Sequence, residues 1–165
     1  MAAALWGFIG TLVGALASIG ATWLSNRQAS SLQASASMLA RIEARRVFQR
    51  DTLLELQEAV LDLMRLIAQG DSEDRAAHRK TGVWGKQLLT PEVNEGQRLA
   101  NRRLTVLVQR VADDALRSEL KTFHSALSKI TLASSAEESE HAFKTLSGHL
   151  TQVMEHLGAE LRAQY

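Results

Sequence analysis

The spacing of apolar residues changes along the chain, from an unbroken apolar run to a helical pattern. The run Ala2–Leu24 holds 23 residues and no charged side chain. A helix rises about 1.5 Å per residue, so this length crosses a hydrocarbon core of roughly 30 Å. The run therefore predicts a transmembrane anchor formed by residues 1–25.

Aromatic and basic residues mark the expected ends of this span. Trp6 and Trp23 are 17 residues apart, which places their rings about 26 Å apart along a helix, the spacing of interfacial aromatic belts. Arg27 follows as a third interface anchor. Because no Lys or Arg precedes the span while Arg27 and Arg41 follow it, the positive-inside rule predicts a single-pass protein of the bacterial inner membrane with a cytoplasmic C-terminal domain.

A cleavable signal peptide is the alternative for this segment. Ala15-Leu16-Ala17 fits the small-residue cleavage pattern. However, no basic residue precedes the apolar run, and the run continues past that site to Leu24. Both features favour an uncleaved anchor.

Small residues recur on one face of the predicted span. Gly10, Gly14 and Ser18 repeat every four residues, and Thr22 continues the row. Such a row lets two membrane helices approach closely and gain van der Waals contact. The row therefore predicts that the chain forms a homo-oligomer through this face.

The following residues show helical spacing with little interruption. Residues 26–40 lack Gly and Pro and are predicted to extend the first helix, and residues 41–165 to form a separate domain. From residue 39 onward one helical row follows steps of three and four, with Arg46 and Gln49 as polar interruptions between its apolar members: Leu39, Ile42, Leu53, Leu56, Val60, Leu63 and Ile67. A second stripe lies beside them: Val47, Leu54, Leu61 and Ala68. The combined face is wider than a two-stranded coiled-coil seam, so it predicts a helix packed inside a bundle.

Turn and cap residues divide the rest of the chain. Gly70–Ser72 is expected to end the long helix, with a short polar helix near residues 73–80. Thr90 and Pro91 open a further helix, Asp113 caps the next one after a phase slip, and Ser135 opens the last. The predicted fold is all-α: an N-terminal transmembrane helix that continues into a cytoplasmic bundle of about four helices.

Composition narrows the function classes. The chain has 165 residues, one proline, no cysteine and a net charge of +1. Cysteine-ligated metals and disulfides are excluded, and the charge balance does not predict nucleic-acid binding.

The histidines give no metal-binding pattern. His149, His156 and Glu160 lie on one rough stripe, but their spacing is longer than the i, i+4 pairs of helical zinc sites. We therefore expect no metal and no cofactor.

Two residues match a loose catalytic pattern. Arg117 and His124 fit the R-x(4–6)-H pattern of HEPN ribonucleases, which are helical bundles that use these side chains in attack of a 2′-OH on phosphate. With 14 arginines and 5 histidines in the chain, about one such match arises by chance. A ribonuclease is therefore the least favoured of the hypotheses.

Trp84 stands between two glycines in the segment Thr81–Gly85. The indole is either a hydrophobic anchor that holds this loop to the bundle or a recognition residue. The tendency of large indoles to be buried favours the anchor.

Two stretches carry a resemblance, VFQRDTLLELQEAV (47–60) and TGVWGKQLLTPEVNEGQRLANRRLTVLVQRVADDALR (81–117). They resemble an uncharacterised family of small bacterial single-pass membrane proteins. The resemblance implies the layout above, but it provides no activity or functional residue to transfer. By layout alone, the chain is also similar to small membrane accessory proteins of RNA-guided antiviral systems, which assemble as pores.

The leading hypothesis is a membrane-anchored, non-enzymatic helical interaction module that self-associates. Its expected partners are the lipid bilayer, further copies of the chain and an unidentified protein, but no nucleic acid. The alternative is an oligomeric pore-forming or membrane-perturbing effector in bacterial stress or antiphage defence.

Overall fold

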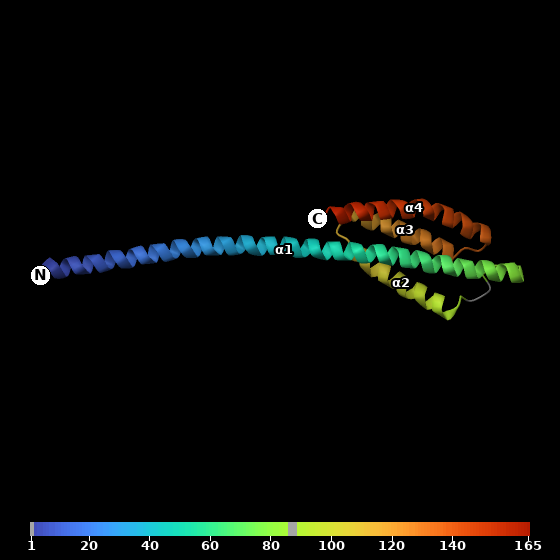
Figure 1. Cartoon of the computed structure of the whole chain (residues 1–165), viewed down its shortest axis with the longest axis horizontal. Helices are drawn as coiled ribbons and strands as arrows, with labels where there is room; N and C mark the ends of the chain where they lie inside the picture. The colour runs from blue at the N-terminus through green and yellow to red at the C-terminus, as the bar shows by residue number, and fades with distance from the viewer. Residues whose placement is uncertain (1, 86–88) are drawn as a thin grey trace. The chain divides into compact units, whose positions relative to one another are not determined.

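The computed structural model describes residues 2–85 and 89–165, and within residues 2–31 it describes only some of the side chains. These residues form the helices α1 (Ala2–Thr81), α2 (Pro91–Arg110), α3 (Asp114–Thr131) and α4 (Ala136–Arg162), with no strand among them (Figure 1). The predictions of an all-α fold and of about four helices are confirmed. The chain separates into two compact units, residues 1–45 and 46–165.

The first unit consists of the N-terminal part of α1. Across the described parts of the chain, no helix is both long and apolar enough to cross a membrane. The predicted membrane span is therefore not supported by the described residues. The described positions of Ala2–Leu24 are mostly Gly, Ala, Ser and Thr, which contribute little hydropathy. Leu16 and Trp23 are described, whereas most of its other large apolar side chains lie outside the described residues: Leu5, Trp6, Phe8, Ile9, Leu12, Val13, Ile19 and Leu24.

The predicted helix end at Gly70–Ser72 is wrong, because α1 continues to Thr81. Gly70 is buried, and a Cβ atom at this position would lie 2.5 Å from the Nε2 atom of Gln97. This glycine therefore serves close contact with α2 rather than a turn. The helix ends instead at Gly82, where the backbone adopts a φ of 71° and the N–H donates to the carbonyl of His78 at 2.8 Å.

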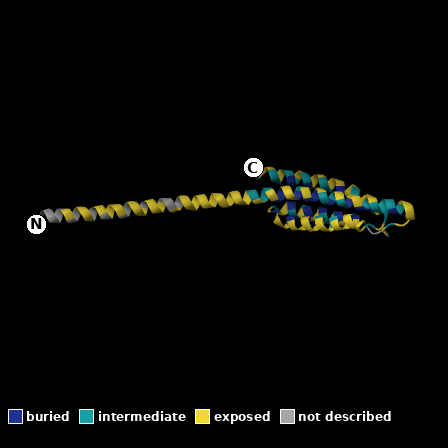
Figure 2. Cartoon of the chain, turned by 60° about the horizontal axis from the view of Figure 1, so that its bottom comes forward, coloured by how far each residue is buried: buried dark blue, intermediate teal, exposed yellow. Residues whose placement is uncertain are grey.

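The second unit is a bundle in which the C-terminal part of α1 packs with α2, α3 and α4. Buried side chains turn inward from all four segments, while the outer faces are exposed (Figure 2). The predicted apolar rows account for most of this core. Its largest fully buried members are Leu56, Val60, Leu63, Val93, Leu104, Leu116, Leu120, Phe123, Leu127, Leu146, Val153 and Leu157.

Two groups of predicted core residues are not buried. Leu54 and Leu61, from the second stripe of the long helix, remain 43% and 50% exposed. Leu39 and Ile42 are 67% and 42% exposed and belong to the first unit. One row of α1 is enough to face the other three helices, so the prediction that the wide face packs inside the bundle is wrong for these residues.

Side-chain caps set the starts of α3 and α4 as expected. The Asp113 carboxylate accepts from the N–H of Leu116 at 2.6 Å, and the Ser135 hydroxyl accepts from the N–H of Glu138 at 3.1 Å. Thr90 precedes α2, but its side chain makes no cap bond. Its N–H and hydroxyl instead donate to the two carboxylate oxygens of Glu73, each at 3.0 Å. The start of α2 is thus tied to α1.

The buried row of α1 gives a stability prediction. Leu56 is fully buried, so Leu56→Ala should destabilise the chain by about 2–5 kcal/mol through lost burial and a new cavity. Leu61→Ala is the matched control, because Leu61 is 50% exposed on the same helix and its loss should cost less than about 0.5 kcal/mol. Thermal melting of the two variants checks this. Equal melting midpoints would show that the buried row is misassigned.

Candidate functional site

Trp84 holds the loop after α1 to the connection between α3 and α4. Its indole N–H donates to the carbonyl of Ala133, in the connection between α3 and α4, at 2.9 Å. The ring meets His78 edge to face at 5.9 Å, and the Arg75 guanidinium lies 6.0 Å from its centroid. The indole is half-buried. These are the contacts of a loop anchor.

A polar network beside Trp84 connects α1 to α4. The Arg75 Nε atom lies 2.6 Å from Asp71, whose side chain is 11% exposed. The second oxygen of Asp71 accepts a hydrogen bond from Ser139, which is fully buried. This role of Asp71 was not predicted from the sequence. The i, i+4 spacing of Asp71 and Arg75 could have indicated their ion pair. The contact with Ser139 could not be predicted in this way, because the two residues are 68 positions apart.

Asp74 lies in the same acidic turn. Partial burial raises the pKa of the Asp74 carboxyl, and the neighbouring charges of Asp71 and Glu73 raise it further. The ionised form of Asp74 is therefore less favourable in the folded protein than in the unfolded chain.

Arg117 and His124, the ribonuclease-like pair, have separate partners. The Arg117 guanidinium donates to the carbonyls of Val111 and Ala112, each at 3.3 Å, and pairs with Asp114. The His124 ring bonds the side chain of Asn101 on α2. The structure therefore uses Arg117 to close the α2–α3 turn and His124 to join α3 to α2.

The histidines of α4 also have different environments. The Nδ1 atom of His156 lies 2.7 Å from the Glu119 carboxylate of α3, whereas the Nδ1 atom of His149 is buried without a hydrogen-bond partner. No group of three or more His, Cys, Asp or Glu side chains among the described residues is arranged to hold a metal ion.

The predicted association and interface residues lie in the first unit. Gly10, Gly14 and Ser18 are exposed, and a Cβ atom built on either glycine meets nothing within 4 Å. The Ser18 carbonyl accepts from the Thr22 hydroxyl at 2.8 Å. The Arg27 guanidinium lies 5.4 Å from the centroid of the Trp23 ring. The side chain of Trp6 lies outside the described residues.

Comparison with known proteins assigns no family. No family model, curated protein or solved structure matches the chain significantly.

The raised pKa of Asp74 gives a pH-dependent prediction. Asp74→Asn removes the partly buried charge, so the variant should melt about 1–3 °C above the native protein near neutral pH. This gain should shrink as the pH falls through the folded-state pKa of Asp74, because protonation then removes the same charge from the native protein. Melting curves from neutral pH to about pH 4 measure the difference.

Asp62→Asn is the control for this experiment. Asp62 lies on the same helix but pairs with Arg65 at 3.4 Å and Arg103 at 4.0 Å, so its replacement should not raise the melting midpoint. Carboxyls such as Glu138, whose pKa is lowered by hydrogen bonds from Ser134, are common to all variants and cancel in the difference. A gain for Asp74→Asn that stays constant with pH would contradict the assignment.

Proposed function

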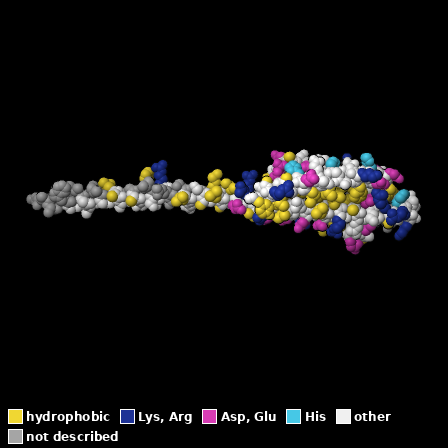
Figure 3. All heavy atoms as spheres, turned by 45° about the horizontal axis from the view of Figure 1, so that its top comes forward, with side chains coloured by type: hydrophobic (Ala, Val, Ile, Leu, Met, Phe, Trp, Pro, Cys, Tyr) yellow, Lys and Arg dark blue, Asp and Glu magenta, His cyan; other side chains and the backbone are white. Residues whose placement is uncertain are grey.

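We propose that this chain is a membrane-anchored, non-enzymatic helical interaction module that self-associates through the N-terminal part of α1. One observation supports this most: large apolar side chains of this part face solvent. Leu32 is 71% exposed, Leu39 67% and Ile42 42%. Apolar side chains appear at the surface of this segment in Figure 3.

The exposed residues follow the heptad spacing of the buried core. Leu32 and Leu39 are related to Leu53, Val60 and Ile67 by multiples of seven. Ile42 is related in the same way to Leu56 and Leu63. In the bundle these two rows are covered by the other helices. Arg46 and Gln49 interrupt the two rows between their exposed and buried parts. Paired apolar rows with this spacing form the seam through which coiled-coil helices associate, so the exposed part can pack against another helix.

A second copy of the chain is the occupant that fits best. Two copies anchored in one membrane present Leu32, Leu39 and Ile42 at the same distance from it, which favours a parallel, in-register pair. The row of Gly10, Gly14 and Ser18 supports the same pairing, because the space beside both glycines is open to a neighbouring helix. The small-residue row and the apolar seam would strengthen each other, because contact at one raises the effective concentration for contact at the other.

The proposed membrane anchor is supported by the sequence. Ala2–Leu24 contains no charge, Trp23 and Arg27 follow the pattern of interface residues, and basic residues come only after the run. The bundle is then cytoplasmic, at the inner membrane of a bacterial cell. Its exposed Leu54 and Leu61 remain available to an unidentified protein partner.

Co-purification of two differently tagged full-length copies from bacterial membranes tests self-association. Leu39→Asp combined with Ile42→Asp should reduce recovery of the second copy by about tenfold or more, since burying one leucine contributes about 1.5–3 kcal/mol. Ser37→Asp combined with Ala44→Asp is the control on another face of the same helix and should leave recovery unchanged. Equal recovery with both pairs would refute association through this seam.

Reporter fusions test the anchor and its orientation. A green fluorescent protein fused after Tyr165 should fluoresce in the membrane fraction, whereas alkaline phosphatase fused there should be inactive. Active phosphatase with a dark fluorescent fusion would contradict the orientation, and release of the chain by alkaline carbonate would contradict the anchor.

A further inference from the structure

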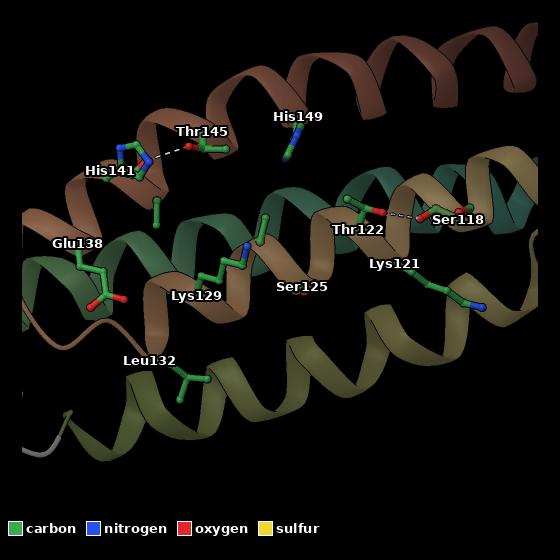
Figure 4. Close-up of a pocket in the computed structure, with 12 residues that line it drawn as sticks. Ser118, Lys121, Thr122, Ser125, Lys129, Leu132, Glu138, His141, Thr145 and His149 are labelled. Carbon is green, nitrogen blue, oxygen red and sulfur yellow. Dashed lines mark hydrogen bonds between the residues drawn. The ribbon is translucent and has the colours of Figure 1, made fainter.

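A groove of about 730 Å³ runs between α3 and α4 on the outside of the bundle (Figure 4). Small side chains, Ala126 and Ala142, line it together with polar ones. Its volume lies within the roughly 300–1,000 Å³ that is common for small-molecule sites. Leu132 adds a larger apolar side chain, so the charged and hydroxyl-bearing side chains of the lining decide which polar ligand the groove can bind.

Two lysines of α3 line the groove without a counterion. Neither Lys121 nor Lys129 makes an ion pair or a side-chain hydrogen bond with any described residue. By contrast, Lys144 of α4 lies outside the groove and pairs with Glu140 at 2.8 Å. The unpaired ammonium groups favour an anionic ligand.

The acidic residue of the groove is already engaged. The Glu138 carboxylate accepts from the N–H of Ser134 at 2.8 Å and from its hydroxyl at 2.7 Å. These bonds lower the pKa of Glu138. The Glu138 carboxylate is therefore bound at the start of α4 and forms no ion pair with Lys121 or Lys129.

A buried histidine nitrogen supplies an independent observation. His149 lines the groove, and its Nδ1 atom is buried with no hydrogen-bond partner. In Figure 4 the side chains of His149 and Lys129 extend from opposite helices into the space between α3 and α4. His149 as a whole is only partly buried, so an anionic oxygen in the groove can accept from its other ring nitrogen and from the Lys129 ammonium together.

Hydroxyl groups complete the lining. The Thr122 and Thr145 hydroxyls each donate to a carbonyl of their own helix at 3.1 Å, so their lone pairs can accept from ligand hydroxyls. No Phe, Tyr or Trp lines the groove, which gives a nucleobase no broad stacking surface.

We propose that this groove binds a phosphorylated polyol, with the phosphate held between Lys129 and His149 and the hydroxyls along the threonines. A free sugar phosphate and the headgroup of an anionic glycerophospholipid share this chemistry. The inference is independent of the self-association proposed above, because it concerns another surface.

Calorimetric titration of the detergent-solubilised full chain with fructose bisphosphate tests the soluble source. Lys121→Gln combined with Lys129→Gln should weaken binding by about tenfold or more, because it removes two charged donors. Lys144→Gln, which alters an exposed lysine outside the groove, should leave binding unchanged. All three replaced lysines are exposed, so the variants keep the core intact.

Nanodiscs test the lipid source with a local readout. Nitrogen-labelled histidine spectra of the full chain are compared in discs of phosphatidylcholine with and without phosphatidylglycerol, with the His149 signal assigned by His149→Gln. Calorimetric binding of fructose bisphosphate supports the proposal with a free sugar phosphate as the ligand. A phosphatidylglycerol-dependent shift of the His149 signal supports it with a lipid headgroup as the ligand. The absence of both overturns it, as does an equal loss of binding in the Lys144→Gln variant.

Discussion

The burial of one apolar row of α1 by the three shorter helices is the interaction on which the bundle depends. Leu56 and Val60 are fully buried, and the facing rows of α2, α3 and α4 converge on them. Polar contacts at the two ends fix the register. The Gln49 side chain donates to the Arg110 carbonyl at 3.0 Å and accepts from the Ala112 N–H at 2.9 Å, while Asp71 reaches Ser139 near the other end.

The need to cover an apolar row also applies to the N-terminal part of α1, where the row is exposed. A helix with an apolar seam gains stability only where that seam is covered. The bundle covers it from Leu53 to Ile67, whereas Leu39 and Ile42 remain exposed. Self-association of the N-terminal part of α1 would cover its exposed apolar residues, as the shorter helices cover those of the C-terminal part.

Features encoded by local spacing could be predicted from the sequence. The rows of α3 and α4 and the caps at Asp113 and Ser135 depend on residues within a few turns of one another. Features that depend on distant neighbours could not. Gly70 resembled a helix end, but its role is set by the approach of Gln97. The partner of Trp84 lies 49 residues away, and the exposure of Leu54 depends on where three other helices pack.

Single-cysteine crosslinking in native membranes tests the central claim most directly, because the chain contains no cysteine of its own. If two copies pair through the exposed seam, Leu39→Cys and Ile42→Cys should each form a disulfide-linked dimer under mild oxidation. Ala44→Cys should stay monomeric, since Ala44 is exposed but lies two residues from Ile42, on another side of the helix. Crosslinking that is equal at all three positions, or absent from Leu39→Cys and Ile42→Cys, would contradict the account.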